Sequence, residues 1–266
     1  MEKRVLAIED LSCMGKCSLT VALPILSAMG CSCSVLPTAL LSAHTGFQNP
    51  HIFSLTEHIL PIANHWQSAG AVFEGISVGY VSDPKQAACI RQVLHMFPAL
   101  RVIDPVLGDH GKLYGGMTQA HIDAIKDLCK LADVLVPNVT EAAILTGLPY
   151  REQGDSVYYQ ELLYKLRQAT PGDVVITGAE TEENSTGFVG YSRTCGEFSY
   201  SAPKIPRQLH GTGDMFAAVL LGKLVQGDTL PCAAQAAAKF VEQVVKVTPE
   251  ATPFGANFEQ VLDKIM

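Results

Sequence analysis

Short apolar runs alternate along this chain with longer segments in which apolar residues recur at helical spacing. Continuous apolar runs suit the strands of a parallel sheet that is covered on both faces. We expect such strands over residues 4–8, 32–37, 71–79, 102–103, 134–136 and 174–177. The longer spacing predicts helices over residues 18–28, 84–96, 118–128, 141–145, 157–168, 215–226 and 232–246. The alternation indicates an α/β protein, a doubly wound three-layer α/β/α sandwich with a mostly parallel central sheet.

Two strand-like runs near the C-terminal third, residues 187–191 and 197–201, break the strand–helix alternation. Their spacing predicts a hairpin, which would add antiparallel edge strands to the sheet. A chain of 266 residues with 48% hydrophobic content can bury one large core, so we expect a single domain over residues 1–266. Ligands should gather at the carboxyl ends of the strands, where folds of this class form their crevice.

Charge and cysteine content narrow the class of protein. The net charge is −7, and the lysines and arginines are scattered, which favours neither nucleic acid nor an anionic membrane as a partner. The first residues enter a strand-like run without a signal-peptide pattern, so we expect a cytoplasmic protein. The eight cysteines show no paired zinc-type spacing, and we expect reduced, mostly buried thiols.

A glycine-rich turn and a carboxylate stand directly before the apolar, alanine-rich segment that begins at residue 215. Gly211 and Gly213 allow backbone N–H groups to converge on an anion, and the start of a helix adds partial positive charge there. Asp214 could take a proton from a hydroxyl bound beside that anion. Thr212 or Asp214 could instead be an ordinary helix cap.

Polar residues also follow the first two predicted strands. Asp10 opens a turn of small residues before a helix and could bind a compact polar ligand, or it could cap that helix. Ser42, His44 and Thr45 follow the second strand and offer hydroxyl and imidazole groups. A lone histidine in such a place is more often structural than catalytic.

Carboxylates recur after two later strands. Asp104 and Asp109 follow the run at residues 102–103, and Glu141 opens a helix three residues after Asn138. Magnesium prefers carboxylate and water oxygens and is often held by one or two carboxylates together with substrate phosphates. Asp104 and Glu141 meet that requirement, although Asn138 or Thr140 could be an ordinary N-cap.

These motifs, in their order along the chain, resemble those of one superfamily. They read Asp-Pro-Val-x-Gly-Asp, Pro-Asn-x-x-Glu, Ile-Thr-Gly and Gly-Thr-Gly-Asp, and no Walker A sequence occurs. The set is similar to that of the ribokinase-like small-molecule kinases and spans nearly the whole chain. The segment at residues 42–46 and the lack of an inserted lid after the first strand resemble the vitamin B6 kinase branch, which implies a ribokinase-like fold without a separate lid domain.

The resemblance implies roles at the phosphate side of the site. Asp214 would be the catalytic base for transfer of phosphate from ATP to the 5'-hydroxymethyl group of pyridoxal, pyridoxamine or pyridoxine. The backbone amides of Gly211, Thr212 and Gly213 would stabilise charge on the transferred group.

The resemblance assigns the remaining binding residues as well. Asp104 and Glu141 would organise Mg²⁺ on the ATP phosphates, with Thr140 and Thr177 as nearby contacts. It leaves open whether a potassium ion joins magnesium, and it implies a homodimer. The pyridine ring would be contacted by side chains further towards the N-terminus, namely Asp10, Thr45 and Tyr80.

Alternatives remain open from the residues. Many vitamin B6 kinases have a serine where this chain has Asp10, and the carboxylate equally suits an aminopyrimidine, as in the hydroxymethylpyrimidine kinases of thiamine synthesis. A non-catalytic binding protein on the same fold is a further alternative. A dinucleotide-dependent oxidoreductase would need Gly-x-Gly-x-x-Gly after an early strand, which is absent. Residues 110–116 contain three glycines and could form a mobile flap over ATP or an ordinary surface turn.

Overall fold

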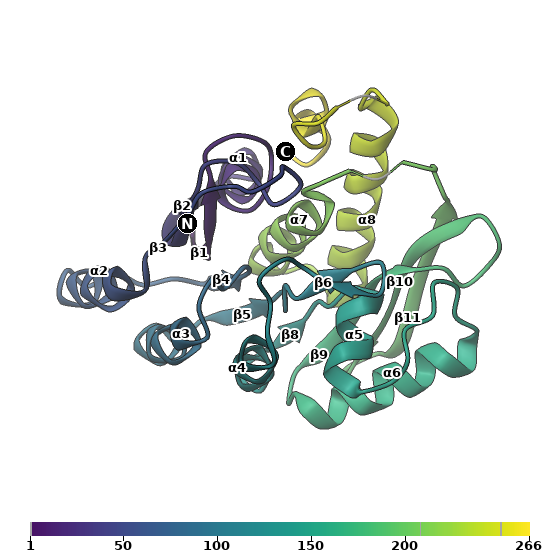
Figure 1. Cartoon of the computed structure of the whole chain (residues 1–266), viewed down its shortest axis with the longest axis horizontal. Coiled ribbons are helices and arrows are strands. Elements are labelled where there is room, and N and C mark those ends of the chain that lie inside the picture. Colours follow the sequence, from purple (N-terminus) through teal and green to yellow (C-terminus); the bar gives the residue numbers. More distant parts are fainter. Residues whose placement is uncertain (1, 208, 251) are drawn as a thin grey trace.

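Nine strands form one sheet in the computed structural model, which describes residues 2–207, 209–250 and 252–266 (Figure 1). Their order across the sheet is β11-β10-β9-β8-β5-β4-β1-β2-β3. The parallel strands are β1 (Lys3–Ser12), β2 (Cys31–Leu41), β4 (Gly75–Val78), β5 (Leu100–Ile103), β8 (Val134–Leu135) and β9 (Asp173–Ala179). The antiparallel strands are β3 (Ile52–Ser54), β10 (Ser185–Ser192) and β11 (Gly196–Pro203). The mostly parallel sheet and its C-terminal edge hairpin confirm the predicted architecture.

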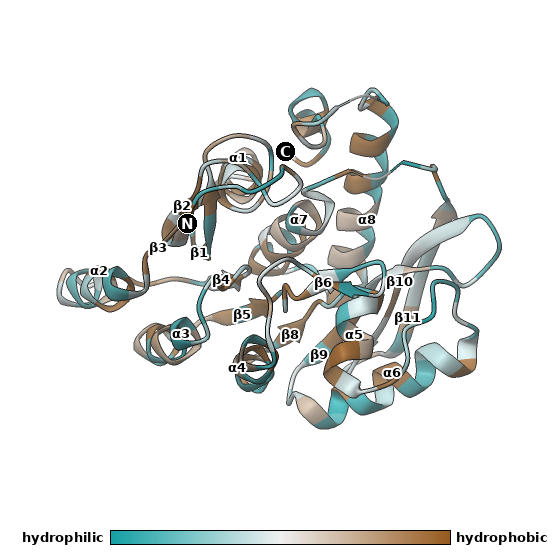
Figure 2. Cartoon of the chain, viewed as in Figure 1, coloured by the Kyte–Doolittle hydropathy of each residue, from teal (hydrophilic) through white to brown (hydrophobic). Residues whose placement is uncertain are grey.

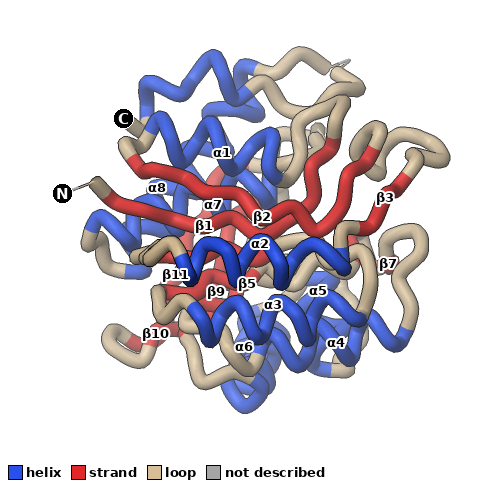
Figure 3. The backbone as a smooth tube through the Cα atoms, turned by 90° about the vertical axis from the view of Figure 1, so that its left-hand side faces the viewer, coloured by secondary structure: helices blue, strands red, loops and turns tan. Residues whose placement is uncertain are grey.

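Helices cover both faces of this sheet. One layer contains α1 (Leu19–Ala28), α7 (Thr212–Gln226), α8 (Leu230–Val247) and the 3-10 helix η1 (Phe258–Lys264). The other contains α2 (Thr56–Ser68), α3 (Lys85–Met96), α4 (Gln119–Cys129), α5 (Val139–Thr146) and α6 (Ser156–Ala169). Figure 3 shows the sheet from the side, with β1 and β2 next to each other and β3 beyond them at the edge.

Burial on both faces explains why the strands are continuous apolar runs. In β1, Leu6 and Ile8 belong to one core cluster and Val5 and Ala7 to the other, and all four side chains are fully buried. In the hydropathy view of Figure 2, β5 is drawn mostly brown, whereas β4 is brown only in part, since its sequence alternates Gly and Ser with Ile and Val. A parallel strand between two helical layers has no solvent face, so alternation of polar and apolar residues is not needed there.

Several predicted boundaries and elements need correction. The first strand extends to Ser12, so Asp10 lies within β1 rather than after it, and residues 71–74 precede β4 instead of belonging to it. Helix α2, strand β3 and η1 were not predicted. Helix α2 contains Pro61 and only two buried residues, and β3 has three exposed residues, so neither carries a strong apolar period. The absence of an inserted lid is confirmed, because β1 leads into α1 through residues 13–18 alone.

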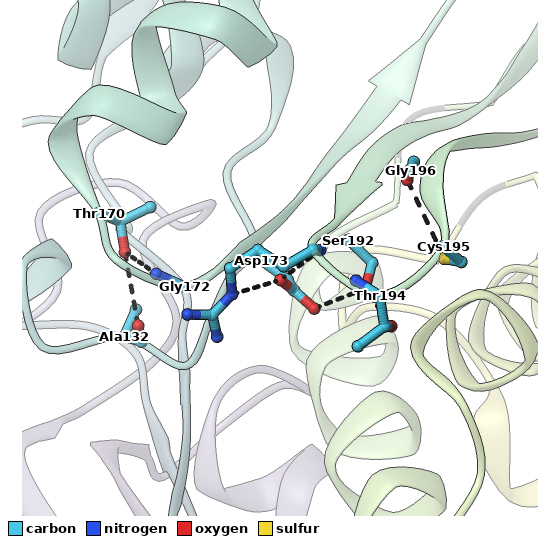
Figure 4. Close-up of polar contacts among 9 residues, drawn as sticks. Ala132, Thr170, Gly172, Asp173, Ser192, Thr194, Cys195 and Gly196 are labelled. Carbon is cyan, nitrogen blue, oxygen red and sulfur yellow. Dashed lines mark hydrogen bonds and ion pairs between the residues drawn. The ribbon is translucent and has the colours of Figure 1, made fainter.

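The turn between β10 and β11 is tied to the start of β9 by the carboxylate of Asp173 (Figure 4). This carboxylate accepts hydrogen bonds from Ser192 Oγ at 2.8 Å and from the backbone N–H of Arg193 at 3.0 Å. The side chain of Arg193 donates to it at 3.2 Å. These contacts fix the edge hairpin at the amino end of β9, and the carboxyl end of β9 points to the opposite side, where the polar residues of the motifs gather.

Within the described part of the chain, no helix combines the length and the apolar character needed to cross a bilayer.

Candidate active site

One cavity of about 1040 Å³ opens at the carboxyl ends of the parallel strands. Every residue that the sequence analysis assigned to a site lines it, although these residues come from seven separate segments of the chain. They are Asp10, Thr45, Tyr80, Asp104, Thr140, Glu141, Thr177, Gly211, Thr212, Gly213 and Asp214. The topology therefore brings the predicted set together at the edge of the sheet where ligands of such folds bind.

The start of α7 forms one wall of the cavity. Gly211 precedes the helix with a φ of 86°, a backbone conformation that favours glycine. A Cβ at Gly211 would stand 2.3 Å from the backbone oxygen of Lys16, so no larger residue fits without displacing the β1–α1 loop. The helix start has no side-chain cap, which contradicts the simple capping interpretation of Thr212 and Asp214. Its first backbone N–H groups are thus directed at the cavity without a side-chain acceptor.

Asp214 is partly buried in the first turn of α7. Its Oδ2 accepts a hydrogen bond of 2.7 Å from the backbone N–H of Ser18, a residue with a φ of 51°. Burial, and next the negative charge of Asp10, raise the pKa of Asp214 to about 6, against the opposing effect of the Ser18 N–H. A carboxylate with such a pKa is ionised at neutral pH and can still accept a proton efficiently, which suits a general base.

Asp10 is held within β1 by two serines that the sequence analysis did not assign. Ser18 Oγ donates to its Oδ1 at 2.5 Å, and Ser12 Oγ donates to its Oδ2 at 3.0 Å. The side chain is almost fully buried, and burial raises its pKa although both serine hydrogen bonds lower it. The hydrogen bonds contradict the interpretation of Asp10 as a helix cap. Ser18 links Asp10 to Asp214, because its hydroxyl donates to the Asp10 carboxylate and its backbone N–H donates to the Asp214 carboxylate.

Glu9, next to Asp10 in β1, is a buried carboxyl group that sequence reasoning missed. Its Oε2 would stand 3.3 Å from a Cβ at Gly79, so the glycine makes room for it. Burial is the first cause of a pKa well above the usual glutamate value, and the charges of Asp214 and Asp10 add to it. The predicted strand ended at Ile8, which left Glu9 unexamined.

The loop after β2, which carries Thr45, packs against a segment near the C-terminus. His44 is 2% exposed, its Nδ1 accepts from the Gly46 N–H at 3.1 Å, and its Nε2 lies 3.2 Å from the carbonyl oxygen of Pro253. The Lys16 N–H donates to the carbonyl of Phe254 at 2.8 Å. His44 therefore has hydrogen-bond partners within the protein, and it also lines the cavity.

Thr45 and Tyr80 face the cavity from two different loops. Thr45 is exposed, whereas Tyr80 is half-buried, and burial followed by the charge of Asp10 raises the pKa of its phenol. Thr38 Oγ1 donates to the backbone carbonyl of Tyr80 at 2.8 Å, which ties the end of β4 to β2.

The start of α5 holds a second acidic group. Asn138 is the N-cap, and its side chain accepts from the Glu141 N–H at 3.0 Å, so the capping interpretation of Asn138 is confirmed. Glu141 returns a hydrogen bond by accepting from the Asn138 N–H at 2.9 Å, and its other oxygen accepts from the Leu107 N–H at 3.0 Å. Burial raises the pKa of Glu141 to about 8, against the effect of these N–H groups.

Asp104 lies close to both Glu141 and Asp214. A Cβ at Gly213 would stand 3.8 Å from its Oδ2, which places Asp104 beside the start of α7. Burial raises its pKa well above the usual value, followed by the charges of Glu141 and Asp214. Such a concentration of carboxylates in a desolvated cavity favours a bound cation.

The glycine-rich segment that was predicted as a flap or turn is a small hairpin of β6 (Gly108–Asp109) and β7 (Lys112–Leu113). Thr140 Oγ1 accepts a hydrogen bond of 2.9 Å from the Gly111 N–H at its tip. Asn138 Nδ2 donates to the carbonyl of Gly108 at 2.9 Å. The hairpin is therefore attached to the start of α5. Thr177, at the end of β9, lines the cavity as well.

Two further expectations concern metals and thiols. Across residues 2–207, 209–250 and 252–266, no group of three or more histidine, cysteine, aspartate or glutamate side chains is arranged to hold a metal ion by itself. All eight cysteines are free thiols, as predicted, but only Cys31 and Cys129 are buried, so the expectation of mostly buried thiols is wrong. Short loops and helix surfaces can expose a cysteine at little cost.

Comparison with known proteins finds kinases in a family model, among solved structures and among curated sequences. The model of a family described as phosphomethylpyrimidine kinase matches residues 23–261. The chain is similar to a Bacteroides thetaiotaomicron protein described as a phosphomethylpyrimidine kinase and crystallised with pyridoxal, with 34% identity, a TM-score of 0.94, and coverage of 100% of this chain and 96% of that one. It is also similar to pyridoxal kinase from Lactobacillus plantarum, with 32% identity, a TM-score of 0.90, and coverage of 99% and 96%. Among curated proteins, the pyridoxine/pyridoxal/pyridoxamine kinase of Bordetella bronchiseptica is 29% identical, and the match covers 93% of this chain and 90% of that one.

Proposed function

The chain belongs to the phosphomethylpyrimidine kinase family, and on this premise we propose that it transfers the γ-phosphoryl group of ATP to the 5'-hydroxymethyl group of a vitamin B6 vitamer. The vitamers are pyridoxal, pyridoxamine and pyridoxine, and the product is the 5'-phosphate. One observation carries the proposal. Asp214, a carboxylate with a pKa of about 6, lies in the first turn of α7, where the backbone N–H groups have no side-chain acceptor and can bind phosphate.

In this proposal the vitamer hydroxyl oxygen attacks the γ-phosphorus of ATP while Asp214 accepts the hydroxyl proton. The bond from the γ-phosphorus to the ADP oxygen breaks, and ADP leaves. The amides of Gly211, Thr212 and Gly213 stabilise the negative charge that spreads over the transferred group. The Ser18 N–H keeps the Asp214 carboxylate oriented during this step.

Magnesium fits the acidic end of the cavity. Asp104 and Glu141 are desolvated carboxylates that repel each other, and one or two such groups together with ATP phosphates are a usual magnesium site. When bound, the metal would neutralise charge on the phosphates. Thr140 and Thr177 would contact phosphate or water, and a potassium ion could occupy the same acidic region.

The vitamer ring is proposed to lie at the other end of the cavity. Asp10 and Thr45 would form hydrogen bonds with its polar groups, and Tyr80 would stack on its face. Asp10 is accessible to a ligand only through the cavity, because the rest of its side chain is covered. Its carboxylate favours a ring that carries a proton or an amino group.

A hydroxymethylpyrimidine kinase is the second candidate, since Asp10 also suits an aminopyrimidine. Pyridoxal in the crystal of the Bacteroides relative and the names of the other relatives favour the vitamin B6 substrate. The non-catalytic alternative is disfavoured, because Asp214, Asp104 and Glu141 are all present in one cavity. We also propose a homodimer in the cytoplasm, and light scattering of the purified protein tests the dimer.

Turnover with MgATP and each candidate substrate tests the proposal. The purified protein would be incubated with pyridoxal, pyridoxamine, pyridoxine or 4-amino-5-hydroxymethyl-2-methylpyrimidine, with ADP release measured and the product identified by mass. We expect the highest kcat/KM with a pyridine. The Asp10→Ser variant should retain activity but lose preference for pyridoxamine over pyridoxal. A higher kcat/KM with the pyrimidine would instead favour the second candidate, and no turnover with any substrate would contradict both.

A further inference from the structure

Carboxylates far outnumber unpaired cations around the cavity. The acidic side chains that line it include Asp10, Asp104, Glu141 and Asp214, whereas its lysine and arginine side chains, within the described residues, are Lys112, Lys204 and Arg207. Transfer of a phosphoryl group from ATP concentrates negative charge, and kinases need cationic groups as well as metal to stabilise it. A lysine or arginine can supply this charge only if its side chain is not already held by another group of the protein.

Two of the three cations are already engaged. Lys204 forms a salt bridge with Glu180. Arg207 donates to the backbone carbonyls of Val245 and Thr248, which directs its guanidinium at the end of α8. The third, Lys112, has no hydrogen bond or ion pair from its ammonium group to any residue that the structure describes.

Lys112 also lies near the part of the cavity where the ATP phosphates are proposed to bind. It begins β7 and pairs with Asp109 across the hairpin. The preceding residue, Gly111, donates its N–H to Thr140 Oγ1 at 2.9 Å, so the backbone of the hairpin tip is attached to the first turn of α5. That turn carries Glu141 and is part of the proposed phosphate end of the cavity. The backbone of Lys112 therefore lies at this end of the cavity, and its flexible side chain can extend the ammonium group inward.

We propose that Lys112 is a further catalytic residue, whose ammonium group contacts the γ-phosphate of ATP and stabilises it during transfer to the vitamer hydroxyl. This inference rests on the proposed kinase function. Lys112 remains protonated throughout, because the hydroxyl proton goes to Asp214 and ADP takes the electron pair of the broken bond. The hairpin is attached to α5, so the flexible side chain of Lys112 is what allows its charge to follow the phosphate during transfer.

The test compares Lys112→Met, Lys112→Arg and the control Lys130→Met with the unaltered protein. Lys130 is an exposed lysine at the C-terminal end of α4. It pairs with Asp127 and does not line the cavity, and its variant makes the same change in net charge. Steady-state kinetics with pyridoxal give kcat and the KM for ATP. Calorimetry without vitamer gives the dissociation constants for MgATP and MgADP, and thermal unfolding confirms the fold of each variant.

We expect Lys112→Met to lower kcat about 100-fold, the cost of removing one charge-stabilising donor. Binding of MgATP should weaken while binding of MgADP stays unchanged, Lys112→Arg should recover much of the rate, and Lys130→Met should behave as the unaltered protein. Equal loss of MgATP and MgADP binding would overturn the inference, because it would indicate a structural role of the hairpin. An active protein in which Lys112→Met retains kcat within twofold would overturn it and leave the kinase function intact. An unaltered protein without turnover would overturn the kinase function itself, and the role in transfer with it.

Discussion

At the scale of single residues, the raised pKa of Asp214 predicts how kcat/KM should depend on pH. Burial raises the pKa of this carboxyl to about 6. A base must be deprotonated to act, so kcat/KM should be constant near pH 7.5 and fall about tenfold per pH unit below 6. Asp214→Asn should lose about 10³-fold in kcat at every pH and bind MgATP almost normally. Kinetics between pH 5 and 8 check this, and a profile unchanged down to pH 5 would exclude Asp214 as the base.

From the sequence, it was possible to predict carboxylate residues that follow strands. Residues whose part in the site depends on backbone groups or on contacts with distant residues were missed. Asp104, Glu141 and Asp214 were identified because a carboxylate beside a strand end or helix start is informative. Ser18 was missed because its importance comes from one N–H and one hydroxyl that reach Asp214 and Asp10 across the fold. No local pattern records a contact between residues that are so far apart in sequence.

At the scale of elements, the start of α7 depends on a glycine that approaches the backbone of the β1–α1 loop closely. Both Gly211, before the helix, and Gly227, after it, have a positive φ, but only Gly211 has an atom in the position of an added Cβ. Gly211→Ala and Gly227→Ala should each cost roughly 1–3 kcal/mol of stability from backbone strain. Only Gly211→Ala should also reduce kcat/KM, by more than about 10²-fold, because it displaces the backbone donors proposed to stabilise the transferred group.

Thermal unfolding and kinetics of the two glycine variants distinguish strain from misplacement. Equal kcat/KM values for Gly211→Ala and Gly227→Ala would show that the close approach to Lys16 does not matter for the site.

Elements with a long, clean apolar period were predicted well, and those made by tertiary contacts were not. Helices α3, α6 and α8 were found to within a few residues, since their buried positions recur at helical spacing. The hairpin β6–β7 has two residues in each strand and is held by Asn138 and Thr140, so its sequence predicted only a glycine-rich turn.

At the scale of the whole molecule, the buried carboxyl groups make folding sensitive to pH. The pKa values of Glu9, Asp10, Asp104, Glu141 and Asp214 are all raised, and that of Glu141 reaches about 8. A carboxyl group whose pKa is higher in the folded protein holds its proton longer there, so its contribution to stability is present at low pH and is lost as the pH rises through the folded value.

We therefore expect the Tm to fall between pH 6.5 and pH 8, and Mg²⁺ to oppose this fall by compensating the negative charge. Glu9→Gln should reduce the slope, because it removes one buried charge outside the proposed binding residues. Differential scanning fluorimetry with and without 10 mM Mg²⁺ measures these changes. A Tm that rises from pH 6.5 to pH 8 would contradict the raised pKa values.

The contact between the β1–α1 loop and the segment at Pro253 and Phe254 has a consequence for the order in which the protein is made. Translation proceeds from the amino end, so Lys16 and His44 leave the ribosome long before these two partners exist. Strands β1, β2, β4 and β5 can pair in the meantime, but the β1–α1 loop and the loop after β2 still lack the segment against which they pack. Synthesis interrupted before residue 253 therefore leaves a chain with all nine strands and the carboxylates of the cavity, but without the backbone contacts that hold these two loops.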